Sequence, residues 1–153
     1  MSTAPAAEQS VSVIDITKVE QIAAPLDIVW ETLLEQLGPL SEMGQGKPFP
    51  MVLEAWPGGR WYRDLGAGTG HLWGHVQVIK PPALLEICGP LFMSYAATSH
   101  VQYRLTTEGV YTVLTLKHKA IGLIMEEHRT GVNEGWGIEL QTIRQKAEAK
   151  AKP

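Results

Sequence analysis

Apolar and polar residues alternate along the chain from Val11 to Ile22. An alternation of period two is typical of a β-strand with one buried face, so these residues predict a long strand. Pro25 then suits the first turn of a helix, and Gly38 followed by Pro39 ends it. Within this predicted helix, apolar residues recur every three or four positions, as on the buried face of an amphipathic helix: Ile28, Val29, Leu33 and Leu37.

Six more strand-like segments follow, and turns rich in glycine and proline separate them. Residues 40–50 are rich in both, so we expect a loop there that contains a short turn of helix. Residues 91–95 form an irregular apolar segment. Because no helix separates the strand-like segments, we expect them to pair antiparallel. The predicted strands cover residues 51–56, 60–65, 71–80, 83–88, 99–106 and 111–119.

The pattern returns to helical spacing over residues 126–149. Gly131, Gly135 and Gly137 lie in this stretch, and each glycine in a helix costs about 1 kcal/mol relative to alanine. They either allow a close approach to the sheet or leave space for a ligand; alternatively, the helix begins only near Gly135. One stripe of the helix is apolar, and it consists of Val132, Trp136, Leu140, Ile143 and Ala147.

The predicted order of elements is strand, helix, six strands and a long helix. This order predicts an α+β fold with an antiparallel sheet of about seven strands and a long C-terminal helix. The 153 residues are enough to form a core without disulfides. We expect residues 1–10, which are small and polar, to be a disordered tail. Residues 11–150 should form a single domain.

Composition and charge restrict the functional classes. The 13 basic and 16 acidic side chains give a net charge of -3 without a basic stripe, which argues against nucleic acid as a partner. No apolar run approaches the ~20 residues of a membrane helix, and residues 1–10 lack the features of a secretory signal. Cys88 is the single cysteine, which suits a reducing compartment. We therefore expect a cytoplasmic protein whose partner is neither nucleic acid nor a membrane.

Short motifs follow one another in a fixed order from the first predicted helix to the last. They are Ala24-Pro25 with Val29-Trp30, Pro57 to Arg60, Gly74 to Val76 before Pro81-Pro82 and Leu85, Leu114 to His118, and Gly135-Trp136 with Leu140 and Ile143. In this order they resemble the SRPBCC superfamily, also called START-like or birch-pollen-allergen-like. Within it, they resemble the homologues of the activator of the heat-shock ATPase. The resemblance covers residues 11–149.

The resemblance implies an α+β helix-grip fold, in which a curved antiparallel sheet of about seven strands surrounds the C-terminal helix. It also implies a cavity between the concave face of the sheet and that helix. In relatives this cavity takes lipids, polyketides, hormones or other apolar molecules. The resemblance also implies that Trp61 and Trp136 face the cavity and that His118 lies at the end of the last strand. Relatives usually carry a tryptophan shortly after the first helix, whereas this chain has none from Gly38 to Met43. The resemblance therefore gives no expectation for the rim of the cavity near that helix.

We accordingly expect the chain to bind a small hydrophobic or amphipathic molecule in this cavity. The alternative for the tryptophans is that they are core residues and fill the space themselves. The alternative for the histidine is a structural role, with its hydrogen bonds made to the backbone. The predicted ligand-binding residues are Trp61, Val76, Tyr103, Leu114 and Trp136 as apolar walls and His118 as the polar contact.

We expect no cofactor and no metal. His71 and His75 lie four residues apart, which on a strand is about 13 Å and too far for one ion. A second hypothesis is an enzyme of the cyclase or dehydratase kind, which requires His75, His118 or a carboxylate to point into the cavity. A third is a co-chaperone-like interaction domain with an exposed apolar patch around residues 91–95. The sequence leaves open whether a reaction is catalysed and whether the chain forms a homodimer.

Overall fold

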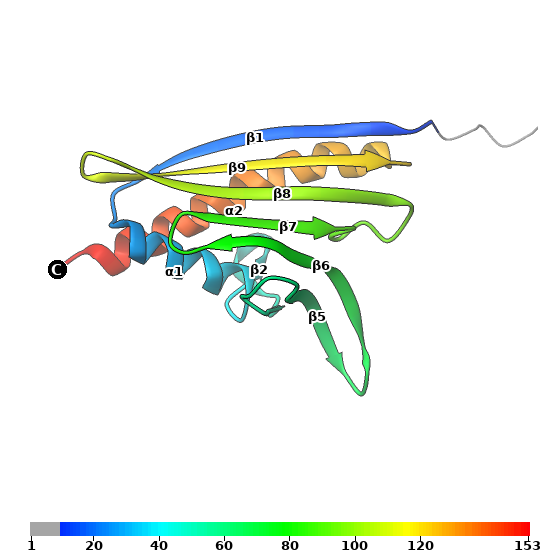
Figure 1. Cartoon of the computed structure of the whole chain (residues 1–153), viewed down its shortest axis with the longest axis horizontal. Coiled ribbons are helices and arrows are strands. Elements are labelled where there is room, and N and C mark those ends of the chain that lie inside the picture. Colours follow the sequence, from blue (N-terminus) through cyan, green and yellow to red (C-terminus); the bar gives the residue numbers. More distant parts are fainter. Residues whose placement is uncertain (1–9) are drawn as a thin grey trace, which may run out of the picture.

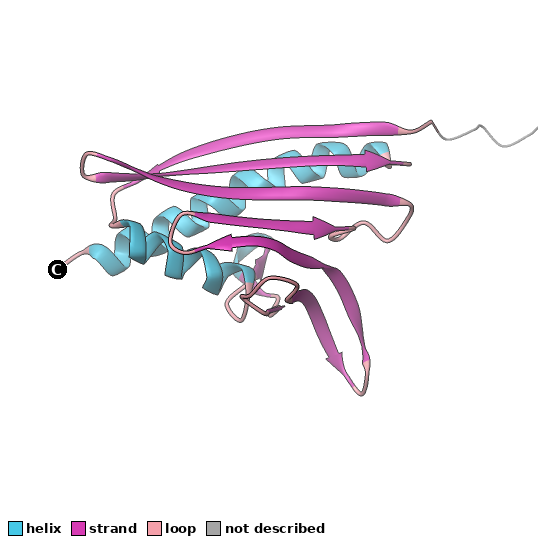
Figure 2. Cartoon of the chain, in the orientation of Figure 1, coloured by secondary structure: helices cyan, strands magenta, loops and turns pink. Residues whose placement is uncertain are grey.

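The computed structural model describes residues 10–153, so the predicted tail lies outside the described residues except for Ser10. A curved antiparallel sheet packs two helices against one of its faces (Figure 1, Figure 2). This arrangement confirms the predicted α+β helix-grip fold. The helices are α1 (Leu26–Leu37) and α2 (Glu126–Ala151), and the strands of the sheet are β1 (Ser12–Ile22), β4 (Val52–Leu53), β5 (Arg60–Gly66), β6 (Thr69–Lys80), β7 (Leu84–Gly89), β8 (Ala97–Glu108) and β9 (Tyr111–Gly122).

The seven strands lie in the order β1-β9-β8-β7-β6-β5-β4, and each pairs antiparallel with its neighbours. The first strand lies beside the last one, so α2 emerges next to β1 and runs back across the inner face of the sheet (Figure 1). Side chains alternate between the two faces of each strand. The pair Tyr103–Leu116 and the pair Val101–His118 are therefore both directed toward the helices from β8 and β9.

Helix α2 confirms the predicted apolar stripe, because its five members are the buried residues of the helix. The helix begins at Glu126, so Gly131 lies inside it and the alternative of a start near Gly135 is wrong. Together with α1, it closes a hydrophobic core that extends over the inner face of the sheet. Within residues 10–153, no helix combines the length and the apolar character that crossing a membrane requires.

The chain between α1 and β5 departs most from the predicted pattern. The predicted loop at 40–50 contains a small hairpin, β2 (Glu42–Met43) and β3 (Lys47–Pro48), around a short 3-10 turn, η1 (Gly44–Gly46). The predicted strand at 51–56 is reduced to β4. It ends early because the Glu54 carboxylate turns back and accepts hydrogen bonds from the Arg60 backbone N–H and guanidinium, each at 2.8 Å.

Candidate functional site

The six predicted ligand-binding residues lie inside the protein, where each is at most 4% exposed. All except His118 belong to one continuous hydrophobic core. The rings of Tyr103 and Trp136 meet edge to face, with centroids 6.4 Å apart. The indole N–H of Trp61 donates to the carbonyl of Leu37 at 2.7 Å, which ties the sheet to the end of α1. These side chains therefore occupy the space between the sheet and the helices.

His118 connects α2 to the sheet through both of its ring nitrogens. The indole N–H of Trp136 donates to Nδ1 at 2.9 Å, so Nδ1 is unprotonated and the proton of the neutral ring is on Nε2. Nε2 lies 2.9 Å from the hydroxyl oxygen of Ser99, to which it donates. Burial lowers the pKa of His118 to about 4. Its partners are side chains rather than the backbone, and they leave neither ring nitrogen free.

A half-open groove lies beside α2, where the helix faces the end of α1 and the small hairpin β2–β3. Its volume is about 280 Å³. Two large apolar side chains border it and remain about half exposed, Met43 from β2 (51%) and Ile138 from α2 (54%). The groove is lined by Gln36, Ser41, Glu42, Met43, Gly44, Gly46, Gly135, Ile138, Glu139 and Thr142.

Glu139 connects this groove to the core. The buried hydroxyl of Tyr103 donates to its Oε1 at 3.0 Å. This hydrogen bond links Tyr103, one of the predicted ligand-binding residues, to a side chain that lines the groove. Although Glu139 keeps some surface in the groove, burial raises the pKa of its carboxyl group to about 7, while the hydrogen bond from Tyr103 works in the opposite direction. Burial, and then the neighbouring Glu139, raise the pKa of Tyr103 well above its usual value.

The carboxylate on the opposite side of the groove has a cationic partner. Glu42 Oε1 accepts a hydrogen bond from Lys146 Nζ at 2.6 Å. The other cations of this half of α2 are also paired: Arg144 with Glu20 and Glu148, and Lys150 with Glu35. Within the described part of the chain, no Lys, Arg or His nitrogen lies within 4 Å of the Glu139 carboxylate. Glu139 is therefore an acid in this groove without a cationic partner.

The three helical glycines leave open space along α2. A Cβ atom added at Gly131, Gly135 or Gly137 would meet no atom of the described structure within 4 Å beyond the local helix backbone. The alternative of a close approach to the sheet is therefore wrong. Gly135 lies in the wall of the groove, one helical turn before Glu139 and on the same face of the helix.

Replacing Gly131 with alanine should stabilise the protein by about 1 kcal/mol, because alanine loses less backbone entropy in a helix and no atom obstructs its Cβ. Urea unfolding followed by circular dichroism measures this change. Gly58→Ala is the matched control, because its Cβ also meets nothing within 4 Å but its backbone φ is +83°. That conformation strains alanine, so the control should be destabilised by about 1 kcal/mol. Equal effects of the two substitutions would contradict the helical conformation of Gly131.

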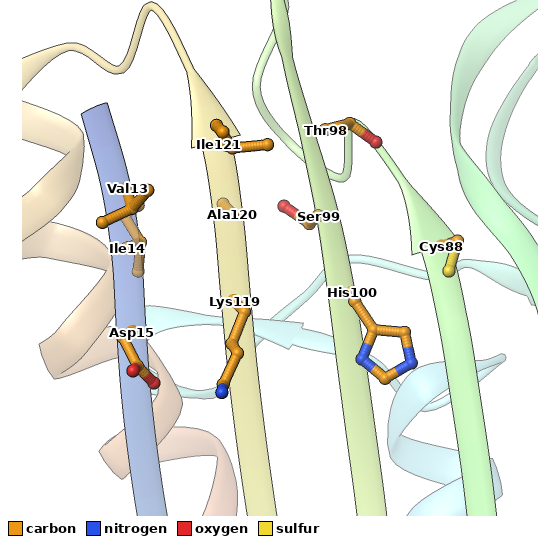
Figure 3. A pocket seen from close by; sticks show the side chains of 10 residues that line it. All are labelled: Val13, Ile14, Asp15, Cys88, Thr98, Ser99, His100, Lys119, Ala120 and Ile121. Atoms are coloured by element: carbon orange, nitrogen blue, oxygen red, sulfur yellow. The ribbon is translucent and has the colours of Figure 1, made fainter. Parts of the chain in front are cut away.

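A second hollow lies on the outer face of the sheet, away from α2 (Figure 3). Its volume is about 560 Å³. Val13 on β1 and Ile121 on β9 are exposed there, and Figure 3 shows them beside each other at one end of the hollow. Asp15 and Lys119 lie opposite each other in the next row. This hollow therefore combines an apolar end with a charged pair, and it contains none of the six predicted ligand-binding residues.

The predicted exposed patch at residues 91–95 is wrong. Leu91 and Met93 are buried because the segment folds back against the inner side of β6. The backbone N–H of Leu91 donates to the carbonyl of Trp73 at 2.7 Å, and the ring of Phe92 meets the Trp73 indole edge to face at 5.7 Å. The exposed apolar side chains of Val13 and Ile121 instead lie on the outer face of the sheet.

Neither histidine named for the enzymatic hypothesis offers a free ring nitrogen to a cavity. His75 is exposed to solvent, and both nitrogens of His118 are engaged. Glu139 is a carboxylate that lines the groove without a cationic partner among the described residues, and the sequence analysis missed it. A signal was present: Glu139 lies three residues after Trp136 and seven after Val132, so it interrupts the apolar stripe of the helix with a charge.

No protein-family model and no curated protein matches the chain. Solved structures do match. An uncharacterised protein from Rhizobium leguminosarum is 17% identical, with 92% of this chain and 99% of that chain covered and a TM-score of 0.66. Ara h 8.0201 is 9% identical, with 90% and 99% covered and a TM-score of 0.68. The di-domain ARO/CYC StfQ from the steffimycin biosynthetic pathway is 13% identical, with 91% of this chain and 50% of that chain covered and a TM-score of 0.61.

These identities are low, so the likenesses concern the fold. They leave the predicted subgroup, the homologues of the activator of the heat-shock ATPase, unconfirmed. The chain therefore shares its helix-grip architecture with structures that include Ara h 8.0201 and an ARO/CYC protein.

Proposed function

We propose that the protein binds a small amphipathic molecule in the groove between α2 and the β2–β3 hairpin. The observation that carries this proposal is the combination of Met43 and Ile138, two half-exposed apolar side chains, with the partly buried carboxylate of Glu139. Binding sites for small molecules commonly combine apolar walls with a few polar groups that fix the orientation of the ligand. The fold also resembles that of an ARO/CYC protein from a biosynthetic pathway, which supports a small organic ligand.

The size of the groove limits the ligand. At about 280 Å³ it lies just below the range of roughly 300–1,000 Å³ that is typical of drug-sized ligand sites. Burial of apolar surface would contribute about 25 cal/mol per Å² to binding. Tyr103 is the predicted residue that a ligand in the groove approaches first, through Glu139. The other five would contact only a ligand that penetrates the core between Trp136 and the sheet.

Replacing Gly135 with leucine should weaken binding at least about tenfold, because a side chain at this position occupies the groove. The probe is N-phenyl-1-naphthylamine, a neutral apolar molecule whose fluorescence rises when it leaves water, titrated with the purified protein. Gly131→Leu is the matched control, because it adds the same side chain to the same helix one turn outside the groove. The wild type and the control should bind the probe equally.

Two results would contradict this proposal. One is the absence of saturable fluorescence with the wild type. The other is equal affinity of the wild type and both leucine variants, which would place the probe elsewhere, for example in the outer hollow beside Val13 and Ile121.

A further inference from the structure

We propose that the groove selects ligands whose polar end is a protonated amine, and that the carboxylate of Glu139 accepts the N–H hydrogen bonds of that amine. The inference rests on the proposed function and adds the chemical class of the ligand's polar end. The ligand is then an amphipathic amine, with an apolar body between Met43 and Ile138 and an ammonium group beside Glu139.

The charges of the groove provide the first argument. Its lining contains two carboxylates, Glu42 and Glu139, and no Lys, Arg or His. Lys146 neutralises Glu42 from outside the lining, whereas Glu139 has no cation within 4 Å among the described residues. A ligand carboxylate or phosphate beside Glu139 would meet a charge of its own sign, while Lys146 is already paired with Glu42. An ammonium group would supply the missing opposite charge.

The geometry around Glu139 provides the second argument. The hydroxyl of Tyr103 occupies Oε1 from the side of the core. Tyr103 is buried in the core and packs against Trp136, so its hydrogen bond holds the Glu139 carboxylate in position from the core side. An ionised carboxylate has about four acceptor positions, and this hydrogen bond uses one of them. The others remain for a donor that arrives through the groove.

Space for that donor lies next to the carboxylate. Gly135 precedes Glu139 by four residues, so the two positions are neighbours on the same face of α2. Where any other residue would place a side chain, the structure has no atom within 4 Å of the Cβ position beyond the local helix backbone. Glycine thus leaves open space beside Glu139, in a groove that Met43 and Ile138 border with apolar side chains.

The environment of Glu139 also favours a cation. Burial raises its pKa to about 7, so near neutral pH the folded protein holds this carboxyl group between its charged and neutral forms. An opposite charge at hydrogen-bond distance stabilises the ionised form and offsets the cost of burial. Hydrogen bonds between charged partners are roughly twice as strong as neutral ones. The site therefore has more to gain from an ammonium group than from a neutral hydroxyl.

Three probes with the same eight-carbon chain test the inference: octylammonium, 1-octanol and octanoate, each below its aggregation concentration at pH 7.5. Amide chemical shifts from NMR titrations of the whole chain give both the affinity and the location of binding. We expect octylammonium to bind about tenfold more tightly than 1-octanol, and octanoate to bind more weakly than both. The shifts should center on residues around Met43, Gly135 and Ile138.

Glu139→Gln is the decisive variant, because it keeps the shape and removes the charge. It should reduce octylammonium affinity about tenfold and 1-octanol affinity much less, because the glutamine oxygen still accepts a hydrogen bond from a hydroxyl group. Glu134→Gln, an exposed substitution on the same helix, should change neither. If 1-octanol binds in the groove but octylammonium gains nothing from Glu139, the inference is wrong and the proposed function stands. If no probe shifts the resonances of the groove, both are wrong.

Discussion

Replacing Trp136 with alanine should lower the free energy of unfolding by about 3–5 kcal/mol, the usual range for a buried aromatic side chain. Trp136 is 4% exposed and packs against Tyr103 and His118, so its removal leaves a cavity between α2 and the sheet. It also removes the donor that satisfies His118 Nδ1. Urea unfolding of the wild type and the variant at pH 7.5 measures the change.

Two further variants separate the causes of this loss. Trp136→Phe retains most of the apolar volume but not the indole N–H, so it should cost about 1–3 kcal/mol for the buried nitrogen left unpaired. Trp56→Ala removes the same side chain at a position that is 57% exposed, and its effect should stay within about 0.5 kcal/mol. If Trp136→Ala costs no more than Trp56→Ala, the indole does not pack as described.

The sequence predicted the fold well because local periodicity reports burial directly. The stripe from Val132 to Ala147 repeats every three or four residues, and a helix with that stripe has one face to bury. Alternation over residues 11–22 likewise required a strand with one inner face, and β1 has that pattern. Proline and glycine between the later segments marked the turns of an antiparallel sheet. These signals do not depend on which side chain meets which across the core.

The candidate site was harder to predict because it depends on such long-range contacts. Trp61 and Trp136 lie in the core on the inner side of the sheet, but the sequence does not tell a pocket wall from a side chain that fills the pocket. The fixed protonation of His118 depends on Ser99 and Trp136, which are 19 and 18 residues away in the sequence. The role of Glu139 as a connection between core and groove is visible only through its hydrogen bond with Tyr103, which is 36 residues away.

The glycines of α2 are a feature that the sequence reveals but only the structure explains. The cost of Gly131, Gly135 and Gly137 was visible in the sequence, but its reason was not. In the structure the three positions share open space, and one of them lies in the wall of a groove beside an acid without a cationic partner. A cost in stability at a site of this kind is what a trade-off between stability and binding predicts.

Replacing Glu139 with glutamine should stabilise the protein at pH 8 and have little effect at pH 4. The pKa of Glu139 is raised by burial from 4.5 to about 7, so between these values the folded protein holds a proton that the unfolded chain has lost. The stability contributed by the protonated group is thus fully present below pH 4.5 and is lost as the pH rises through 7. The difference corresponds to about 3 kcal/mol at most, and partial exposure to water reduces it.

His118 gives this experiment its characteristic pH profile. Burial lowers its pKa from 6.5 to about 4, so its contribution is fully present above pH 6.5 and is lost as the pH falls toward 4. Between pH 6.5 and 4.5 the two groups oppose each other, and wild-type stability should change little from their combined effect. In the Glu139→Gln variant the His118 contribution acts alone, so the free energy of unfolding should fall steeply as the pH is lowered from 6.5 to 4.5.

Thermal unfolding of the wild type, Glu139→Gln and the exposed control Glu134→Gln at pH 8, 6 and 4 measures both effects. The control should follow the wild type at every pH, because residue 134 is exposed to solvent. A Glu139→Gln variant that is less stable than the wild type at pH 8 would contradict the burial of an acid without a cationic partner. It would show instead that the ionised carboxylate stabilises the fold, and Glu139 would then have a cationic partner within the protein and no free charge for an amine.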